Sequence, residues 1–230
     1  MPHAAPYFSS ATFDFLRQLR QNNNRPWFHA HKPDYEALVR EPALALITDL
    51  QPVLAKISSH MVAMPKKVGG SLFQVARDAR KKPSEPYKPW IGLRFYHAQR
   101  NQVHAPSFFV HIDPETNNSF MGGGLWRPEP PTLKRLRNFL DENPRSWQTA
   151  TASKALQRYE DDGEWLTRVP RGYPANHPLE ADLRRKSFVW TRPLPLVQAE
   201  SAELPRILGK TFREVAPVMD YLCAALDLPF

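Results

Sequence analysis

The stretch SLFQVARDARKKPSEPYKPWIGLRF, residues 71–95, combines apolar alternation, adjacent opposite charges and a turn rich in lysine and proline. From residue 71 the apolar period is two, which places Phe73, Val75 and Arg77 on one face of an extended segment. The run IGLRF, residues 91–95, repeats the alternation after the turn. We therefore predict two strands joined by a cationic turn, with the remaining sheet built beside them.

Further strands follow along the chain. Residues 107–113 and 119–125 alternate in the same way, although three consecutive glycines are expected to interrupt the second run. A later strand is predicted at residues 187–191. The connections between the first four strands are too short for crossover helices, which favours an antiparallel meander.

Helical periodicity dominates both ends of the sequence. A helix is predicted after an N-cap at Ser10, and a longer apolar stripe covers residues 35–57, where Pro42 and Pro52 should bend or break the helix. Helices return after the sheet, and the last covers residues 200–226. We predict a single α+β domain over residues 1–230, an antiparallel sheet of about four to six strands flanked by N-terminal and C-terminal helices.

Composition sets the class of partner. The 230 residues carry a net charge of +8, which favours anionic ligands because the field of the whole protein steers them in. The single cysteine, Cys223, rules out an intramolecular disulfide and points to a reducing compartment. The N-terminal residues lack a secretory pattern, and no apolar run is long enough for a membrane span. We therefore expect a soluble cytoplasmic protein that does not bind membranes.

The turn between the first two strands is the leading candidate site. Arg77 and Asp78 are neighbours on an extended segment, so their side chains point to opposite faces and need separate partners. Cations crowd the prolines that follow, namely Arg80, Lys81, Lys82 and Lys88. Arginine offers a bidentate fork to a phosphate or carboxylate, and lysine offers a movable point charge. A stiffened turn of this kind suits an anion.

Our first hypothesis is that this groove binds an anionic small molecule or a phosphorylated group. Arg77 and Arg80 would clamp the anion, Asp78 would orient one arginine, and Tyr87 and Lys88 would complete the groove. The alternative is a structural turn whose arginine pairs with a carboxylate across the sheet, because ion-pair networks produce the same pattern. Both stay open at this point.

Two further functions use other residues. His111 and Asp113 share a strand face, so the carboxylate could orient the imidazole for general acid or base catalysis. The alternative is a half-buried sheet histidine, since no serine or cysteine nucleophile accompanies the pair. A third hypothesis is a nucleic-acid or protein-interaction module on the basic surface, although no nucleic-acid motif supports it.

No metal or cofactor is predicted. His29 and His31 are two residues apart and diverge on a helix, and no cysteine or further histidine completes a zinc-like spacing. The glycines at 122–124 are not followed by a dinucleotide fingerprint, and no GKS or GKT phosphate loop occurs.

Several separated motifs nevertheless occur in a familiar order. They are Phe15-Leu16-x-x-Leu19, Asn23-Asn24-Arg25-Pro26-Trp27-Phe28, Arg77-Asp78-x-Arg80 with Pro86-Tyr87-Lys88, Gly123-Gly124-Leu125-Trp126-x-Pro128, Val169-Pro170-Arg171-Gly172-Tyr173 and Lys186-Ser187-Phe188. With these motifs the chain resembles the bacterial and fungal domain-of-unknown-function family 2461 over nearly its whole length. The resemblance implies no activity, since the family has none established. Residues 81–85 depart from the family pattern. At this place the family pattern resembles an aromatic residue, a Ser and an Asp-Lys pair, and it is one residue longer. The loop of this chain is therefore more basic than the family pattern.

Overall fold

The computed structural model describes residues 5–78, 80, 84–100, 104–115, 118–161, 163–174 and 176–230. Its strands form one six-stranded antiparallel sheet in the order β1-β2-β3-β4-β6-β5 within these residues. The strands are β1 Met61–Val62, β2 Ile91–His97, β3 Ser107–Ile112, β4 Phe120–Leu125, β5 Glu160–Asp161 and β6 Phe188–Pro193. The predicted α+β class is confirmed, with helices before and after the sheet.

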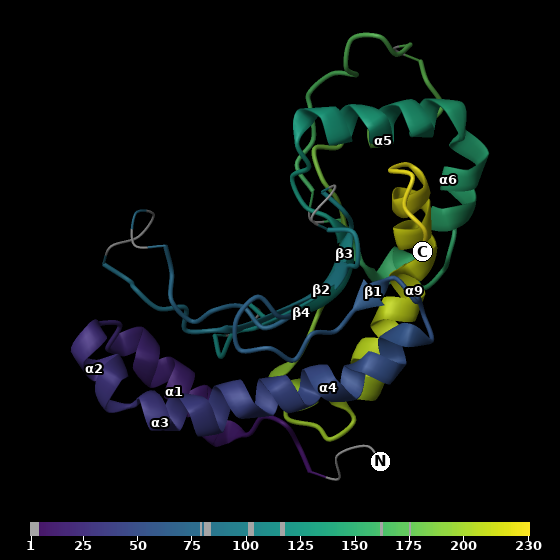
Figure 1. The fold of residues 1–230 in the computed structure, drawn as a ribbon. Helices are drawn as coiled ribbons and strands as arrows, with labels where there is room; N and C mark the ends of the chain where they lie inside the picture. The colour runs from purple at the N-terminus through teal and green to yellow at the C-terminus, as the bar shows by residue number, and fades with distance from the viewer. Residues whose placement is uncertain are drawn as a thin grey trace.

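The helices fall into an N-terminal and a C-terminal group (Figure 1). The first group comprises α1 Ser10–Gln21, α2 Arg25–Ala30, α3 Lys32–Tyr35, the π-helical turn η1 Glu36–Arg40 and α4 Glu41–Ala55. The second comprises α5 Pro130–Glu142, α6 Pro144–Thr151, the 3-10 turn η2 Leu156–Arg158, α7 Glu180–Leu183, α8 Leu196–Ala199 and α9 Leu204–Ala224. None of these helices, within the described ranges, is long and apolar enough to cross a membrane.

Two details of the first helices differ from the sequence-based expectation. The N-cap of α1 is Ser9 rather than Ser10, because Ser9 has the extended backbone that a cap requires. Neither Pro42 nor Pro52 breaks the helical path from α3 through α4. Pro42 lies just after the π-helical turn η1, whose wider hydrogen-bond spacing interrupts the α-helical ladder at the point where the proline N–H is missing.

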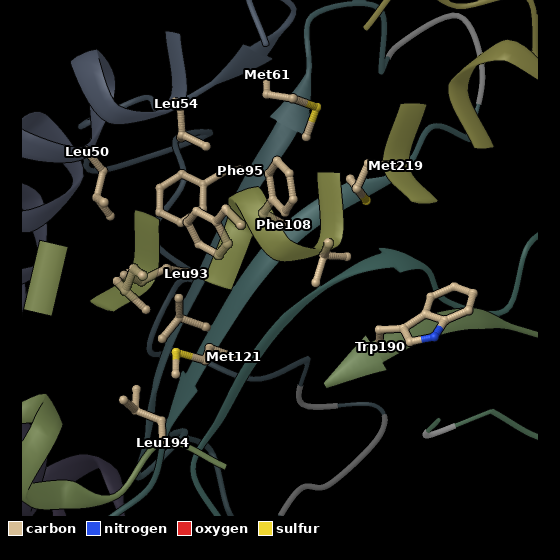
Figure 2. Close-up of a cluster of buried hydrophobic side chains, with 14 of the residues drawn as sticks. Leu50, Leu54, Met61, Leu93, Phe95, Phe108, Met121, Trp190, Leu194 and Met219 are labelled. Carbon is tan, nitrogen blue, oxygen red and sulfur yellow. The ribbon is translucent and has the colours of Figure 1, made fainter. Parts of the chain in front are cut away.

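The apolar core lies between one face of the sheet and helices α4 and α9. Figure 2 shows Leu50 and Leu54 of α4 on the same side of the sheet as Phe95 and Phe108. Phe212 of α9 stacks on Phe108 with a centroid separation of 4.7 Å. All five side chains are buried. Because side chains alternate along a strand, the intervening residues of β2 and β3 lie on the opposite face, which this core does not use.

Residues 71–78 do not form the strand that their alternation predicts. They make two isolated bridges instead, Leu72 with Leu93 and Ala76 with Tyr87. Prolines at 86 and 89 lack the N–H that a continuous ladder needs, which explains why the pairing stays broken. We call the described residues of 71–90 the arm. It extends from the sheet over α1 and α2 (Figure 1).

The glycines of β4 are a second correction. They do not interrupt the strand, since β4 pairs with β6 along its whole length to Leu125 and with β3 as far as Gly124. Gly122 and Gly124 pass so close to β6 that a Cβ on either would lie 2.0 Å from a carbonyl oxygen. The absence of side chains therefore permits this pairing instead of ending it.

Candidate functional site

The arm is fixed to the end of α1 by one asparagine side chain. The Asn23 amide nitrogen donates to the Tyr87 carbonyl oxygen over 3.0 Å, and the Tyr87 N–H donates to the Asn23 side-chain oxygen over 3.0 Å. The Asn23 side-chain amide thus makes the two hydrogen bonds to the Tyr87 backbone that the peptide groups of a neighbouring strand would otherwise make. The Tyr87 ring is buried and stacks on Phe28 with centroids 4.0 Å apart. Tyr87 therefore contributes its backbone and ring to the anchoring of the arm.

Two of the predicted anion-binding cations contact the arm itself. The Arg77 guanidinium donates to the Tyr87 carbonyl oxygen over 3.0 Å and lies 3.6 Å from a Glu85 carboxylate oxygen. The Lys88 ammonium donates to two backbone carbonyl oxygens of the opposite segment, those of Gln74 at 2.6 Å and Ala76 at 3.2 Å. Burial, followed by repulsion from Arg77, lowers the pKa of Lys88. These contacts hold the two segments of the arm together.

The other predicted arm residues lie on its surface. The Arg80 guanidinium donates to both carboxylate oxygens of Asp78, over 3.0 and 2.9 Å. The Arg80 side chain is 89% exposed, so this pair is solvated. Lys81 and Lys82 of the predicted cationic turn lie outside the described residues. The structure therefore brings Arg77, Tyr87 and Lys88 together, while Arg80 and Asp78 form a separate pair. The anion clamp at these residues stays a prediction.

His111 and Asp113 have different partners. The Asp113 carboxylate, only 4% exposed, accepts hydrogen bonds from Arg20 of α1 over 2.6 and 2.8 Å and from the Glu115 N–H over 3.0 Å. This ion pair fastens the end of β3 to α1. No hydrogen bond joins Asp113 to His111 in the described part of the chain. General acid or base catalysis by His111 stays a prediction, and Asp113 is not placed to orient its ring.

The His111 ring lies among aromatic side chains. Its centroid is 4.5 Å from that of Trp90, and it stacks on Phe120 at 4.9 Å with an interplanar angle of 17°. Burial is the largest effect on this imidazole and lowers its pKa below the usual 6.5, although the Asp113 carboxylate opposes the shift. The ring is therefore neutral at neutral pH.

His111 belongs to a pocket on the face of the sheet opposite the core. The pocket encloses about 240 Å³ and takes side chains from the arm, from four strands and from the segment after β4. No aspartate or glutamate lines it among the described residues. The lining residues are Phe73, Gly92, Leu93, Arg94, Ser107, Phe109, Val110, His111, Phe120, Gly124, Trp126, Val189 and Thr191.

Glycines create the hollow. In the register of the sheet, Phe109 faces Gly122 and Ser107 faces Gly124, so β4 projects no side chain at these two positions. Gly124 also has φ +142°, a conformation that residues with a Cβ rarely adopt. On β2, a Cβ at Gly92 would lie 2.5 Å from the Trp90 ring. Bare peptide planes therefore form part of the pocket floor.

Arg94 supplies the charge of the pocket. It faces Phe109 across the sheet, and its Nε donates to the Ser107 hydroxyl over 2.8 Å. The guanidinium lies over the Tyr96 ring at 5.1 Å. No carboxylate in the described ranges forms an ion pair with it. Burial and then the Arg94 charge lower the pKa of the neighbouring His104. The pocket thus contains a cation whose observed partners are uncharged.

Sequence reasoning placed Arg94 on the correct face of β2 but assigned it no role. The available signal was an arginine within the alternating run IGLRFYH, on the face opposite Leu93 and Phe95. Nothing local to that run shows that Ser107 or the glycines of β4 lie beside it. Metal binding has no support in the described residues, since no three histidine, cysteine, aspartate or glutamate side chains gather there.

Comparison with known proteins assigns the chain to a family. The family model described as "Conserved hypothetical protein (DUF2461)" matches residues 11–221. The chain belongs to this family. No curated protein and no solved structure gave a significant match. The DUF2461 motifs recognised in the sequence meet in pairs: Asn23 bonds Tyr87, Leu125 pairs with Phe188, and the Arg127 N–H donates to the Ser187 hydroxyl over 2.9 Å.

Proposed function

We propose that this DUF2461 protein binds an anionic small molecule with a flat apolar body in the pocket over Gly124. The observation that carries the proposal is the Arg94 guanidinium, which lies in an apolar hollow with no lining carboxylate among the described residues. A cation taken partly out of water is stabilised by an opposite charge, and arginine matches carboxylate and phosphate geometry. An acid group beside Arg94 and Ser107 meets that need.

The remainder of the pocket favours a planar apolar body. Phe109, Phe120 and Trp126 contribute aromatic surface, and Gly124 leaves bare backbone on which a ring can lie. Aromatic rings pack well against such surfaces, in offset or edge-on arrangements. The volume of about 240 Å³ is at the small end for ligand pockets and suits a ligand of one or two rings.

One cation of the arm, Lys88, adds positive charge near the pocket. The Lys88 ammonium lies 5.9 Å from the centroid of Phe73, a lining residue, and 5.7 Å from that of Trp90, which packs against His111. Of the predicted groove residues, Lys88 therefore lies beside a lining residue of the pocket. In this proposal its positive charge favours the approach of an anion, while Arg94 makes the direct contact.

Two isosteric probes test the proposal. 2-Naphthoate carries the acid group, and 2-naphthamide has the same shape without the charge. Isothermal titration calorimetry should show that the protein binds 2-naphthoate more tightly. Replacement of Arg94 by methionine should weaken 2-naphthoate binding by about tenfold to a hundredfold, since a hydrogen bond to a charged group contributes about 1.5–3 kcal/mol, and should leave 2-naphthamide binding nearly unchanged.

Arg100→Met is the matched control. Arg100 also lies over the Tyr96 ring, at 4.2 Å, but it donates to the Gly69 carbonyl and does not line the pocket. Its replacement removes the same charge from the protein and should change 2-naphthoate affinity by less than about twofold, because Arg100 is not among the residues that line the pocket. Equal binding of the two probes, or equal losses in the two variants, would contradict the proposal.

A further inference from the structure

The pocket has a further polar side chain, His111, at a distance from Arg94. His111 and Ser107 lie on the same face of β3, four residues apart, and Arg94 donates to Ser107. At about 3.3 Å per residue, this spacing separates the two positions by about 13 Å. The apolar residues between them include Phe109, which has the same orientation. A ligand lying along β3 would therefore meet an arginine at one end and an imidazole at the other.

The His111 imidazole is held ready to bond such a ligand. Trp90 and Phe120 pack against its ring, and Gly92, its neighbour across β2, projects no side chain beside it. In the described part of the chain, no group hydrogen-bonds either ring nitrogen. A neutral imidazole donates through one nitrogen and accepts through the other. It can therefore bond a hydroxyl or a carbonyl group without needing a second charge.

We propose that the ligand is a rigid aromatic acid with an uncharged polar group at its far end: the acid lies at Arg94 and Ser107, and the polar group bonds His111. This inference rests on the proposed function and defines its ligand class. The two protein positions are about 13 Å apart, which is the upper limit for the separation of the two polar groups of the ligand. If both hydrogen bonds, of about 2.9 Å each, lie along the same line, the separation falls to about 7 Å.

An uncharged far end fits the surroundings of His111 better than a second acid. Phe73, Trp90 and Phe120 make that end of the pocket apolar, and desolvation of a second carboxylate would be costly there. The charges that act on His111 are those of Asp113 and Arg20, which already pair with each other, and the Lys88 ammonium beside Trp90 is bonded to two backbone carbonyls. A hydroxyl, by contrast, needs only the one hydrogen bond that the imidazole offers.

The test compares 2-naphthoate with 6-hydroxy-2-naphthoate, whose hydroxyl lies at the far end of the ring system. The hydroxyl should improve affinity by about threefold to tenfold in calorimetry, the range expected for one neutral hydrogen bond. Its 5-hydroxy isomer, which carries the same group at the side, should show no such gain. In the His111→Phe protein the gain should vanish: 6-hydroxy-2-naphthoate should bind this variant no more tightly than 2-naphthoate does, because phenylalanine offers no hydrogen bond to the hydroxyl.

The outcomes separate the two proposals. If 2-naphthoate itself does not bind, the proposed function fails, and the inference that rests on it fails too. If 2-naphthoate binds but the 6-hydroxyl adds nothing, or the 5-hydroxy isomer gains as much, only the present inference is overturned. Survival of the gain in His111→Phe would overturn it as well. The isomer comparison uses the unchanged protein, so it decides the question even if the variant fails to fold.

Discussion

Replacement of Asn23 by alanine should release the arm from α1. The substitution removes two hydrogen bonds, both 3.0 Å long, to the backbone of Tyr87. The Tyr87 carbonyl keeps its bond from Arg77, but the Tyr87 N–H, in a residue only 8% exposed, loses its observed partner. At about 0.5–1.5 kcal/mol for each bond, with an added cost for the unpaired donor, we expect a loss of about 2–3 kcal/mol.

Urea denaturation measures this loss directly, and the slope of the transition should not change. Thermal unfolding should shift by about 4–12 °C, at about 2–4 °C per kcal/mol for a chain of this length. Asn22→Ala is the matched control, since the Asn22 amide is exposed and donates only to Gln18 one turn back; its cost should stay within about 0.5 kcal/mol.

Hydrogen exchange locates the effect. In the Asn23→Ala protein the Tyr87 amide should lose protection, while the amides of β2 that pair with β3 should keep theirs. The reasoning is refuted if Asn23→Ala costs no more than Asn22→Ala, or if the Tyr87 amide exchanges at the same rate in the variant and the parent.

Two more predictions concern His111 and the packing of α4 on α9. Because burial lowers the pKa of His111 in the folded state, the unfolded chain binds more protons below pH 6.5, and stability should fall as pH drops below that value. His111→Phe should reduce this loss of stability, measured by urea titrations between about pH 5 and 7. The loss that remains should include the contribution of His104, whose pKa is also lowered. An unchanged pH profile would contradict a lowered pKa of His111. Gly209→Ala should destabilise the protein by about 1–2 kcal/mol despite its better helix propensity, because the added Cβ would lie 2.5 Å from a Val53 methyl. In a Val53→Ala background the same change should cost clearly less, so strictly additive effects would be evidence against this contact.

The strands β2 and β3 were predictable because their signal is local. Leu93 and Phe95 alternate with Arg94 over enough residues to show a period of two, and β3 repeats the pattern. The edge strands β1 and β5 were missed, since two residues cannot show a period. The arm was overpredicted as a strand, because alternation reports which way side chains face and not whether a backbone partner with free N–H groups is present.

The candidate site was harder to predict because its contacts are long-range. Asp113 was paired with His111 from their closeness in sequence, but its partner is Arg20, 93 residues away, on α1. The signal for Arg94 was only its place in an alternating run, which does not by itself indicate a binding residue. What distinguishes it in the described structure is that no carboxylate pairs with it or lines its pocket, and that glycines on another strand leave a hollow; neither property can be read along one segment.

In the proposed function, arm residues such as Lys88 affect ligand binding without touching the ligand. Lys88 is bonded to backbone carbonyls while it lies beside the rings of Phe73 and Trp90. These two rings occupy the space over Gly92, where any side chain on β2 would displace them. Asn23 fixes the arm on α1, the arm holds the rings in place, and Trp90 packs against His111. A substitution on the arm can therefore alter the surroundings of His111 through packing alone. Loss of binding after such a substitution would demonstrate direct contact with the ligand only if the fold of the arm were shown to be intact.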